Sequence, residues 1–221
     1  LVAHEWRDRR VVDHVGPVVV HEAGPEHGRV GGRDRQHDPR GEDVGPRVDL
    51  LAPGVLALLV FVGGFVDVTD YVDVYMLASP WTGYFNFAFS TGAATMAVPN
   101  EGWGMALGGH LNDNWYLIGG FADSNSDPTD PLDGLETFFD DREYFKHIEL
   151  GWNASRETAF LNNIHLTLWH NDEREAAATP DGWGANLSFS KSLNEHWIPF
   201  LRLGYAKDAG TLLERSLSTG F

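Results

Sequence analysis

The stretch NIHLTLWHN, residues 163–171, alternates between two kinds of side chain. Ile164, Leu166 and Leu168 are aliphatic, whereas His165, Thr167 and Trp169 are polar or amphipathic. Successive side chains of a β-strand point to opposite faces, so a strand over this stretch has one apolar face and one polar face. This alternation constrains the fold more than any other feature of the chain, because it recurs along most of the sequence.

The same period of two predicts a series of antiparallel strands separated by polar turns. We expect nine strands, near residues 66–77, 83–90, 103–109, 115–122, 145–153, 163–171, 183–190, 197–205 and 211–219. No comparable stretch has the pattern of a helix. The predicted fold class is therefore all-β and antiparallel.

The two faces of the predicted strands favour a transmembrane β-barrel, here a partial barrel of about nine strands. Aromatic residues stand at strand ends on the apolar face, as in GWGANLSFS (182–190) and HWIPFLRLGY (196–205), and membrane interfaces favour such residues. Short turns (112–114, 192–196) alternate with long acidic loops (123–144, 171–182), as they do in outer-membrane barrels. A soluble antiparallel sandwich also alternates, so that alternative remains open.

Residues 1–63 differ from the rest of the chain. They contain no Ser, Thr, Asn, Lys, Tyr, Ile or Met, yet hold eight of the sixteen basic residues, all of them arginine. Two interpretations account for this atypical segment: an out-of-frame or otherwise spurious translation, or a disordered arginine-bearing extension. Residues 64–221 form the predicted barrel part, with 8 Lys+Arg against 22 Asp+Glu.

Composition excludes several classes of function. There is no cysteine, so disulfides, iron–sulfur clusters and thiol nucleophiles are excluded. A formal net charge of -16 argues against a nucleic-acid partner. No continuous apolar run approaches the length of about 18 residues that a spanning helix needs. The first ten residues, LVAHEWRDRR, lack the pattern of a signal peptide, so either the protein is not exported or its true start is missing.

Several blocks of residues 64–221 resemble the carbohydrate-selective porins of the OprB type. They occur in a consistent order, and the two most specific are the Trp-His-acidic-Arg run of NNIHLTLWHNDERE (162–175) and the strand PFLRLGYA (199–206). The other blocks are DVTDYVDVYMLASPWTGYFNFAFSTG (67–92), LNDNWYLIGGFADSNSD (111–127), FFDDREYFKHIELGW (138–152) and GWGANLSFS (182–190).

The resemblance implies a sixteen-stranded barrel in the bacterial outer membrane that lets sugars diffuse down their gradient. Its partners would be carbohydrate solutes and outer-membrane lipid, with no cofactor and no enzymatic activity. The chain departs from the family pattern because it lacks a signal peptide and the first part of the barrel, and it stops at Phe221 where family members continue. We therefore expect a fragment of such a barrel.

A sugar pore needs hydrogen-bonding groups and aromatic faces that match a pyranose. The polar faces of the predicted strands supply candidates. Arg202 and Glu149 are the strongest of these, because charges inside a lumen set the local potential and can pair together. The remaining candidate substrate-binding residues are His147, His165, Trp169, Asn186 and Ser188, each of which could equally be an ordinary wall residue solvated by lumen water.

No catalytic or metal site emerges from the sequence. Asp123, Asn125 and Asp127 follow a D-x-N-x-D spacing, but a calcium loop needs Gly at the position of Pro128 and Glu at the position of Gly134. His165 and His170 point to opposite faces of one strand, which argues against a metal site. Besides the porin, a soluble sugar-binding β-sandwich and an outer-membrane barrel enzyme remain alternatives.

Overall fold

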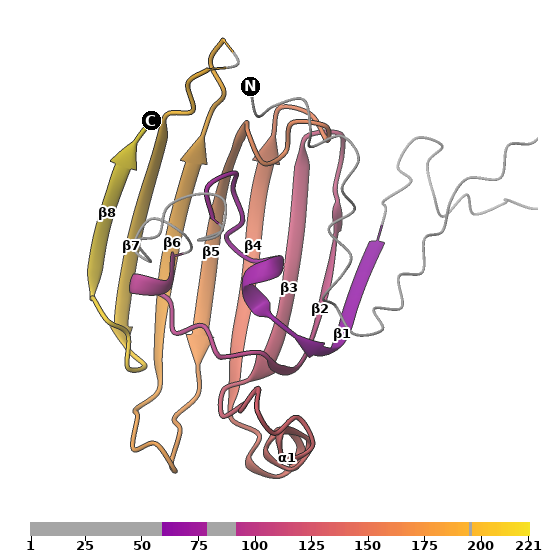
Figure 1. Ribbon diagram of the computed structural model, residues 1–221, viewed down its shortest axis with the longest axis vertical. Coiled ribbons are helices and arrows are strands. Elements are labelled where there is room, and N and C mark those ends of the chain that lie inside the picture. Colours follow the sequence, from indigo (N-terminus) through magenta and orange to yellow (C-terminus); the bar gives the residue numbers. More distant parts are fainter. Residues whose placement is uncertain (1–58, 79–91, 195) are drawn as a thin grey trace, which may run out of the picture.

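The computed structural model describes residues 59–78, 92–194 and 196–221 (Figure 1). They form one antiparallel sheet of eight strands whose order in space follows their order in the sequence. The strands are β1 (Leu59–Val66), β2 (Gly102–His110), β3 (Trp115–Asp123), β4 (Tyr144–Asn153), β5 (Asn163–Asn171), β6 (Gly182–Ser190), β7 (Phe200–Asp208) and β8 (Arg215–Gly220). The all-β antiparallel prediction is confirmed, and the sheet is open, with β1 and β8 at its edges.

Seven of the nine predicted strands overlap observed strands, β2 to β8. Strand β8 begins later than the predicted strand 211–219, because residues 211–214 belong to the turn before it. Strand β7 begins at Phe200 rather than at 197, because Leu193 and Trp197 close a small turn through an isolated bridge. The predicted strand 83–90 lies outside the described residues.

The prediction of a strand over 66–77 was wrong. Only Val66 belongs to a strand, and a 3-10 helix, η1 (Val68–Asp70), follows it. The Asp67 side chain accepts a hydrogen bond from the Thr69 backbone N–H at 2.8 Å and so caps this helix. Val68 and Val72 are both buried, at the spacing of one helical turn, which a period of two does not anticipate.

Strand β1 was not predicted, and it crosses the boundary that we placed between residues 63 and 64. Leu59 to Val66 pair in register with Gly109 to Gly102 of β2. Residues 59–63 share the narrow composition of the preceding segment, and that composition concealed a strand-forming sequence of Val, Phe and Leu.

Two short helical elements lie in the loop between β3 and β4, where no helix was expected. They are α1 (Asp133–Glu136) and the π-helical turn η3 (Thr137–Asp141). Within the described part of the chain, no helix is long and apolar enough to cross a bilayer.

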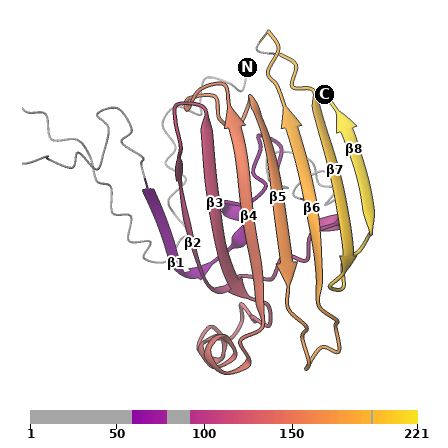
Figure 2. The ribbon, with the colours of Figure 1, turned by 180° about the vertical axis from the view of Figure 1, so that it is seen from behind.

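One face of the sheet is covered by the chain that connects β1 to β2. We call residues 67–78 and 92–101 the covering segment; it includes η1 and a second 3-10 helix, η2 (Gly92–Ala94). In Figure 1 this segment lies in front of the strands, and in the opposite view of Figure 2 it lies behind them. Val68, Val72 and Met96 of this segment pack on Phe145 and Trp169 of the sheet in the main hydrophobic cluster.

The other face carries aliphatic side chains that no described segment covers at its centre (Figure 2). Six leucines from six neighbouring strands face one another in register across it: Leu117, Leu150, Leu166, Leu187, Leu203 and Leu217. All but Leu187 are exposed, and Leu217 is 68% exposed. The sheet therefore presents its most apolar row outward.

Candidate functional site

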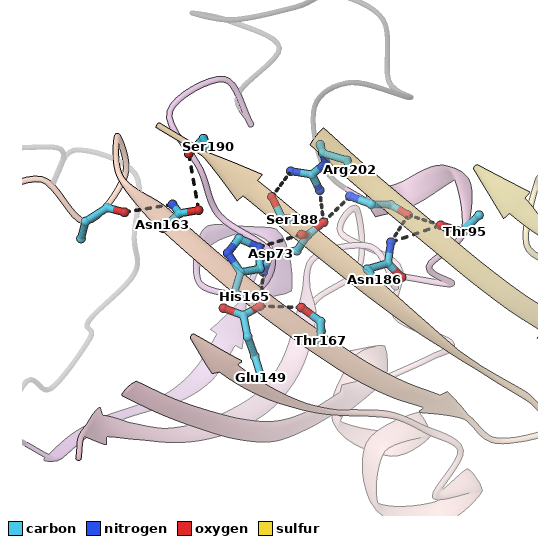
Figure 3. A network of polar contacts seen from close by, with 12 residues as sticks. Asp73, Thr95, Glu149, Asn163, His165, Thr167, Asn186, Ser188, Ser190 and Arg202 are labelled. Carbon is cyan, nitrogen blue, oxygen red and sulfur yellow. Dashed lines mark hydrogen bonds and ion pairs between the residues drawn. The ribbon is translucent and has the colours of Figure 1, made fainter. Parts of the chain in front are cut away.

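The candidate site is a buried polar network between the sheet and the covering segment (Figure 3). All seven residues predicted from the sequence as substrate-binding lie on the covered face, because they occupy the alternate positions of β4 to β7 that pair with one another. Each is at most 6% exposed. They were expected to line water, and in this structure the covering segment shields them from it.

Asp73 is the centre of the network, and the sequence analysis did not identify it. Its carboxylate accepts hydrogen bonds from Arg202, from the backbone N–H of Gly92 and, at 2.9 Å, from the His165 ring nitrogen Nε2. Figure 3 shows Asp73 between the strands that carry His165 and Arg202. The one carboxylate thus joins the covering segment to both β5 and β7.

The charges around Asp73 keep it ionised despite its complete burial. Burial raises the pKa of the Asp73 carboxyl, but Arg202 and His165 lower it by more, so the pKa lies below its usual value. A buried carboxylate needs such partners, because an unpaired charge in a protein interior is costly.

Glu149 is the second carboxylate of the network, and it contacts the backbone of Asp73 rather than its side chain. Its Oε2 accepts hydrogen bonds from the backbone N–H of Asp73 at 2.7 Å and from the Thr167 hydroxyl at 2.6 Å. Its Oε1 accepts from the Tyr116 hydroxyl at 2.8 Å. Three strands and the covering segment therefore meet at this side chain.

Arg202 has contacts on three sides. Besides Asp73, it donates to the Ser188 hydroxyl at 3.3 Å, and its guanidinium carbon lies 4.3 Å from the centre of the Tyr75 ring. Stacking on Tyr75 is a cation–π contact, which the planar guanidinium favours. Arg202 and Glu149 contact different parts of Asp73: Arg202 donates to its carboxylate, and Glu149 accepts from its backbone N–H.

Asn186 attaches the second half of the covering segment. Its Nδ2 donates to the Thr95 hydroxyl at 3.1 Å and to the Gly92 carbonyl at 3.3 Å. The Thr95 hydroxyl also lies 3.3 Å from that of Ser216 on β8. Residues 92–95 are thereby fixed over β6 and β8.

His147 and Trp169 belong to an aromatic stack rather than to the hydrogen-bond network. The centre of the Phe145 ring lies 6.0 Å from that of His147 and 6.1 Å from that of Trp169. On the side of the covering segment, the centre of the Tyr71 ring lies 5.8 Å from that of His147. Neither nitrogen of His147 nor the indole N–H of Trp169 has a hydrogen-bond partner among the described residues.

The seven residues predicted from the sequence share one face of the sheet, but the residues that the covering segment adds were not predicted. Asp73, Tyr75 and Thr95 lie in a segment that period-two alternation misassigned or left unassigned. Asp73 is 92 residues from His165 and 129 residues from Arg202 along the chain, so no local pattern links them.

The network is a structural and electrostatic arrangement with no metal-ligand geometry. Among the described residues, no group of three or more His, Asp or Glu side chains is suited to hold a metal ion. The network holds the covering segment against the sheet with two carboxylates, one guanidinium and several hydroxyls.

Comparisons with models of protein families, with curated proteins and with solved structures find no match to this chain.

Proposed function

We propose that this chain forms part of the wall of an outer-membrane porin through which carbohydrates diffuse passively. The observation that carries the proposal is the row of exposed leucines in register on one face, combined with a polar face turned toward protein. A water-soluble sheet buries its apolar face, so the reverse arrangement suits a wall whose outer surroundings are hydrocarbon.

The aromatic side chains support this placement. On the apolar face Trp115 pairs with Trp152 at the end next to the short turn 111–114. At the opposite end Trp103 contacts Phe65, and Trp183 contacts Tyr205 with ring centres 5.4 Å apart. Phe121 of β3 stands in the same row of paired residues as Trp183. It is six residues from Trp115, or about 20 Å at about 3.3 Å per residue. Aromatic rows at both ends of an aliphatic band correspond to the two interfaces of a membrane.

The position of the covering segment agrees with a pore whose lumen is narrowed by a segment inside it. It starts and ends at the rim of the long loops and lies over the polar face, where a barrel has its lumen (Figure 1). In this proposal the segment fills part of the lumen, and solutes pass along its free side. The proposal that the solutes are sugars rests on the resemblance of the sequence to carbohydrate-selective porins.

Strands β1 and β8 each leave one edge unpaired in the described sheet. An unpaired edge does not persist in hydrocarbon, because each unsatisfied backbone group is costly there. A closed pore therefore needs further strands beside β1 and β8.

A swelling assay with reconstituted vesicles tests the proposed function. Vesicles that contain the refolded chain are diluted into isotonic glucose, sucrose or raffinose, and swelling reports sugar entry. We expect swelling that is fastest in glucose and slows as the sugar grows, and none with vesicles made without protein. Because a closed pore needs partners at both edges, the outcome that would contradict the proposal is a membrane-inserted assembly with the edges of β1 and β8 paired that still admits no sugar.

A further inference from the structure

A cavity of about 300 Å³ lies at the rim of the long loops, away from the Asp73 network. Its walls come from the covering segment, from the ends of β3 and β5 and from the turn after β7, which meet at the lower edge of the sheet in Figure 1. In the proposed porin, this rim is the extracellular side, because outer-membrane barrels have their longer loops there. The cavity thus lies where a solute enters.

The lining of this cavity combines polar and apolar groups and carries a single charged side chain. Thr69 and Thr211 contribute hydroxyls, Asn100 and Asn171 contribute amides, and Arg174 contributes a guanidinium. No carboxylate lines it, although residues 64–221 hold 22 acidic side chains. Pro99, Val98 and Leu212 add apolar surface.

Arg174 is held in place by its backbone, while its side chain has unused hydrogen-bonding capacity. Its backbone N–H and carbonyl both pair with Thr179, at 2.9 and 3.1 Å. The guanidinium extends toward the turn after β7, where a Cβ added at Gly210 would lie 3.6 Å from its Nη2. Nε is buried and has no hydrogen-bond partner among the described residues. Nη2 donates only a long hydrogen bond of 3.5 Å to the Thr179 hydroxyl, so the guanidinium retains donors for an acceptor that a ligand delivers into the cavity.

From these features we infer that the cavity binds a single carboxylated pyranose, a sugar of the uronic acid class. The carboxylate would pair with the Arg174 guanidinium, whose planar fork matches a carboxylate. The ring hydroxyls would meet the threonine and asparagine side chains, and the apolar surface would contact the ring carbons. Its volume is at the lower end of that of ligand pockets, which limits the occupant to one ring.

The role at the pore entrance rests on the proposed function, but binding itself can be measured without a pore. Calorimetric titration of the refolded chain in detergent with D-glucuronate, D-glucose and acetate tests the assignment. We expect glucuronate to bind at least about tenfold more tightly than either glucose or acetate, since only glucuronate offers both a ring and a carboxylate. Equal affinity for glucuronate and glucose, or for glucuronate and acetate, would overturn it.

Two matched variants connect binding to the cavity. Arg174→Gln removes the charge and is expected to reduce glucuronate affinity to that of glucose. Arg142→Gln removes the same charge from a neighbouring loop at the same rim, where the Arg142 Nε donates to the Phe139 carbonyl at 3.0 Å, and should bind like the parent. An equal loss in both variants would overturn the assignment in favour of a general charge effect. Circular dichroism and thermal unfolding of both variants establish that they fold.

The swelling assay separates this inference from the porin function. Intact glucose entry without glucuronate binding would overturn the cavity assignment alone. Glucuronate binding that depends on Arg174, in a closed, membrane-inserted assembly that admits no sugar, would uphold the cavity as a binding site and overturn the porin function.

Discussion

Asp73 shows at the scale of a residue how one buried side chain organises a site. It brings together a guanidinium, an imidazole and a backbone amide from positions up to 129 residues away. Its backbone has φ 59°, in the left-handed region, which Asp and Asn adopt more readily than most residues. In this conformation the backbone N–H of Asp73 donates to Glu149, while its side chain accepts from Arg202 and His165.

Replacing Asp73 leaves the Arg202 charge buried without its partner. We expect Asp73→Asn to lower the free energy of unfolding by roughly 3–5 kcal/mol, which is typical when one member of a buried pair is removed. Denaturant titration of the refolded chain in micelles measures the change.

The double variant Asp73→Asn/Arg202→Met provides the control. It removes both charges, so its loss of stability should be smaller than the sum of the two single losses, by about 0.5–3 kcal/mol. Additive losses would show that Asp73 and Arg202 do not stabilise each other.

A second residue-scale prediction concerns the apolar face. Leu203 stands in the central leucine row and is 41% exposed. If lipid surrounds it, Leu203→Arg should cost about 2–4 kcal/mol in bilayers. Leu132, in the loop between β3 and β4, is 76% exposed, and Leu132→Arg should change stability by no more than about 0.5 kcal/mol. Similar small effects at both positions would place Leu203 in water.

At the scale of the element, glycines on the covered face make room for large side chains. A Cβ at Gly184 would lie 2.4 Å from the Tyr205 carbonyl oxygen and 2.5 Å from the Trp169 ring. A Cβ at Gly204 would lie too close to the Thr95 hydroxyl of the covering segment. The absence of a side chain at these glycines of β6 and β7 therefore lets the aromatic stack and the covering segment pack close to the backbone.

The variant Gly184→Ala should push the Trp169 ring out of its stack. We expect a loss of about 1–3 kcal/mol, the usual range for overpacking, together with a change in the near-ultraviolet circular dichroism of the tryptophans. Gly119→Ala is the matched control, because its Cβ would lie 3.4 Å from the nearest atom, in ordinary contact. If Gly184→Ala is as well tolerated as Gly119→Ala, the packing described for Trp169 is wrong.

At the scale of the whole molecule, the two faces of the sheet are reversed relative to a soluble protein. Charged and hydroxyl side chains are buried under the covering segment, and leucines are exposed on the other face. Exposed apolar patches of this extent mark interaction surfaces. The proposed membrane wall would leave the leucines exposed in this way, whereas in a soluble sugar-binding sandwich a second layer would cover them.

Detergent dependence tests this arrangement on the whole chain. We expect the refolded protein to aggregate in plain buffer and to be monodisperse in octyl glucoside micelles, as judged by size exclusion with light scattering. Leu203→Arg should reduce the bound detergent, while Leu132→Arg should not. A chain that is folded and monodisperse without detergent would contradict the membrane assignment and favour the soluble module.

The sequence by itself determined the strands β2 to β7 and the face on which each of their side chains lies, because alternation with a period of two is a local property of an extended backbone. It therefore placed Glu149, His165, Asn186 and Arg202 together on one face. Only the tertiary structure decided what covers that face and what pairs with what. The contacts of Asp73, Thr95 and Tyr75 join segments far apart in the chain, and such contacts depend on how the chain returns across the sheet, which no local period encodes.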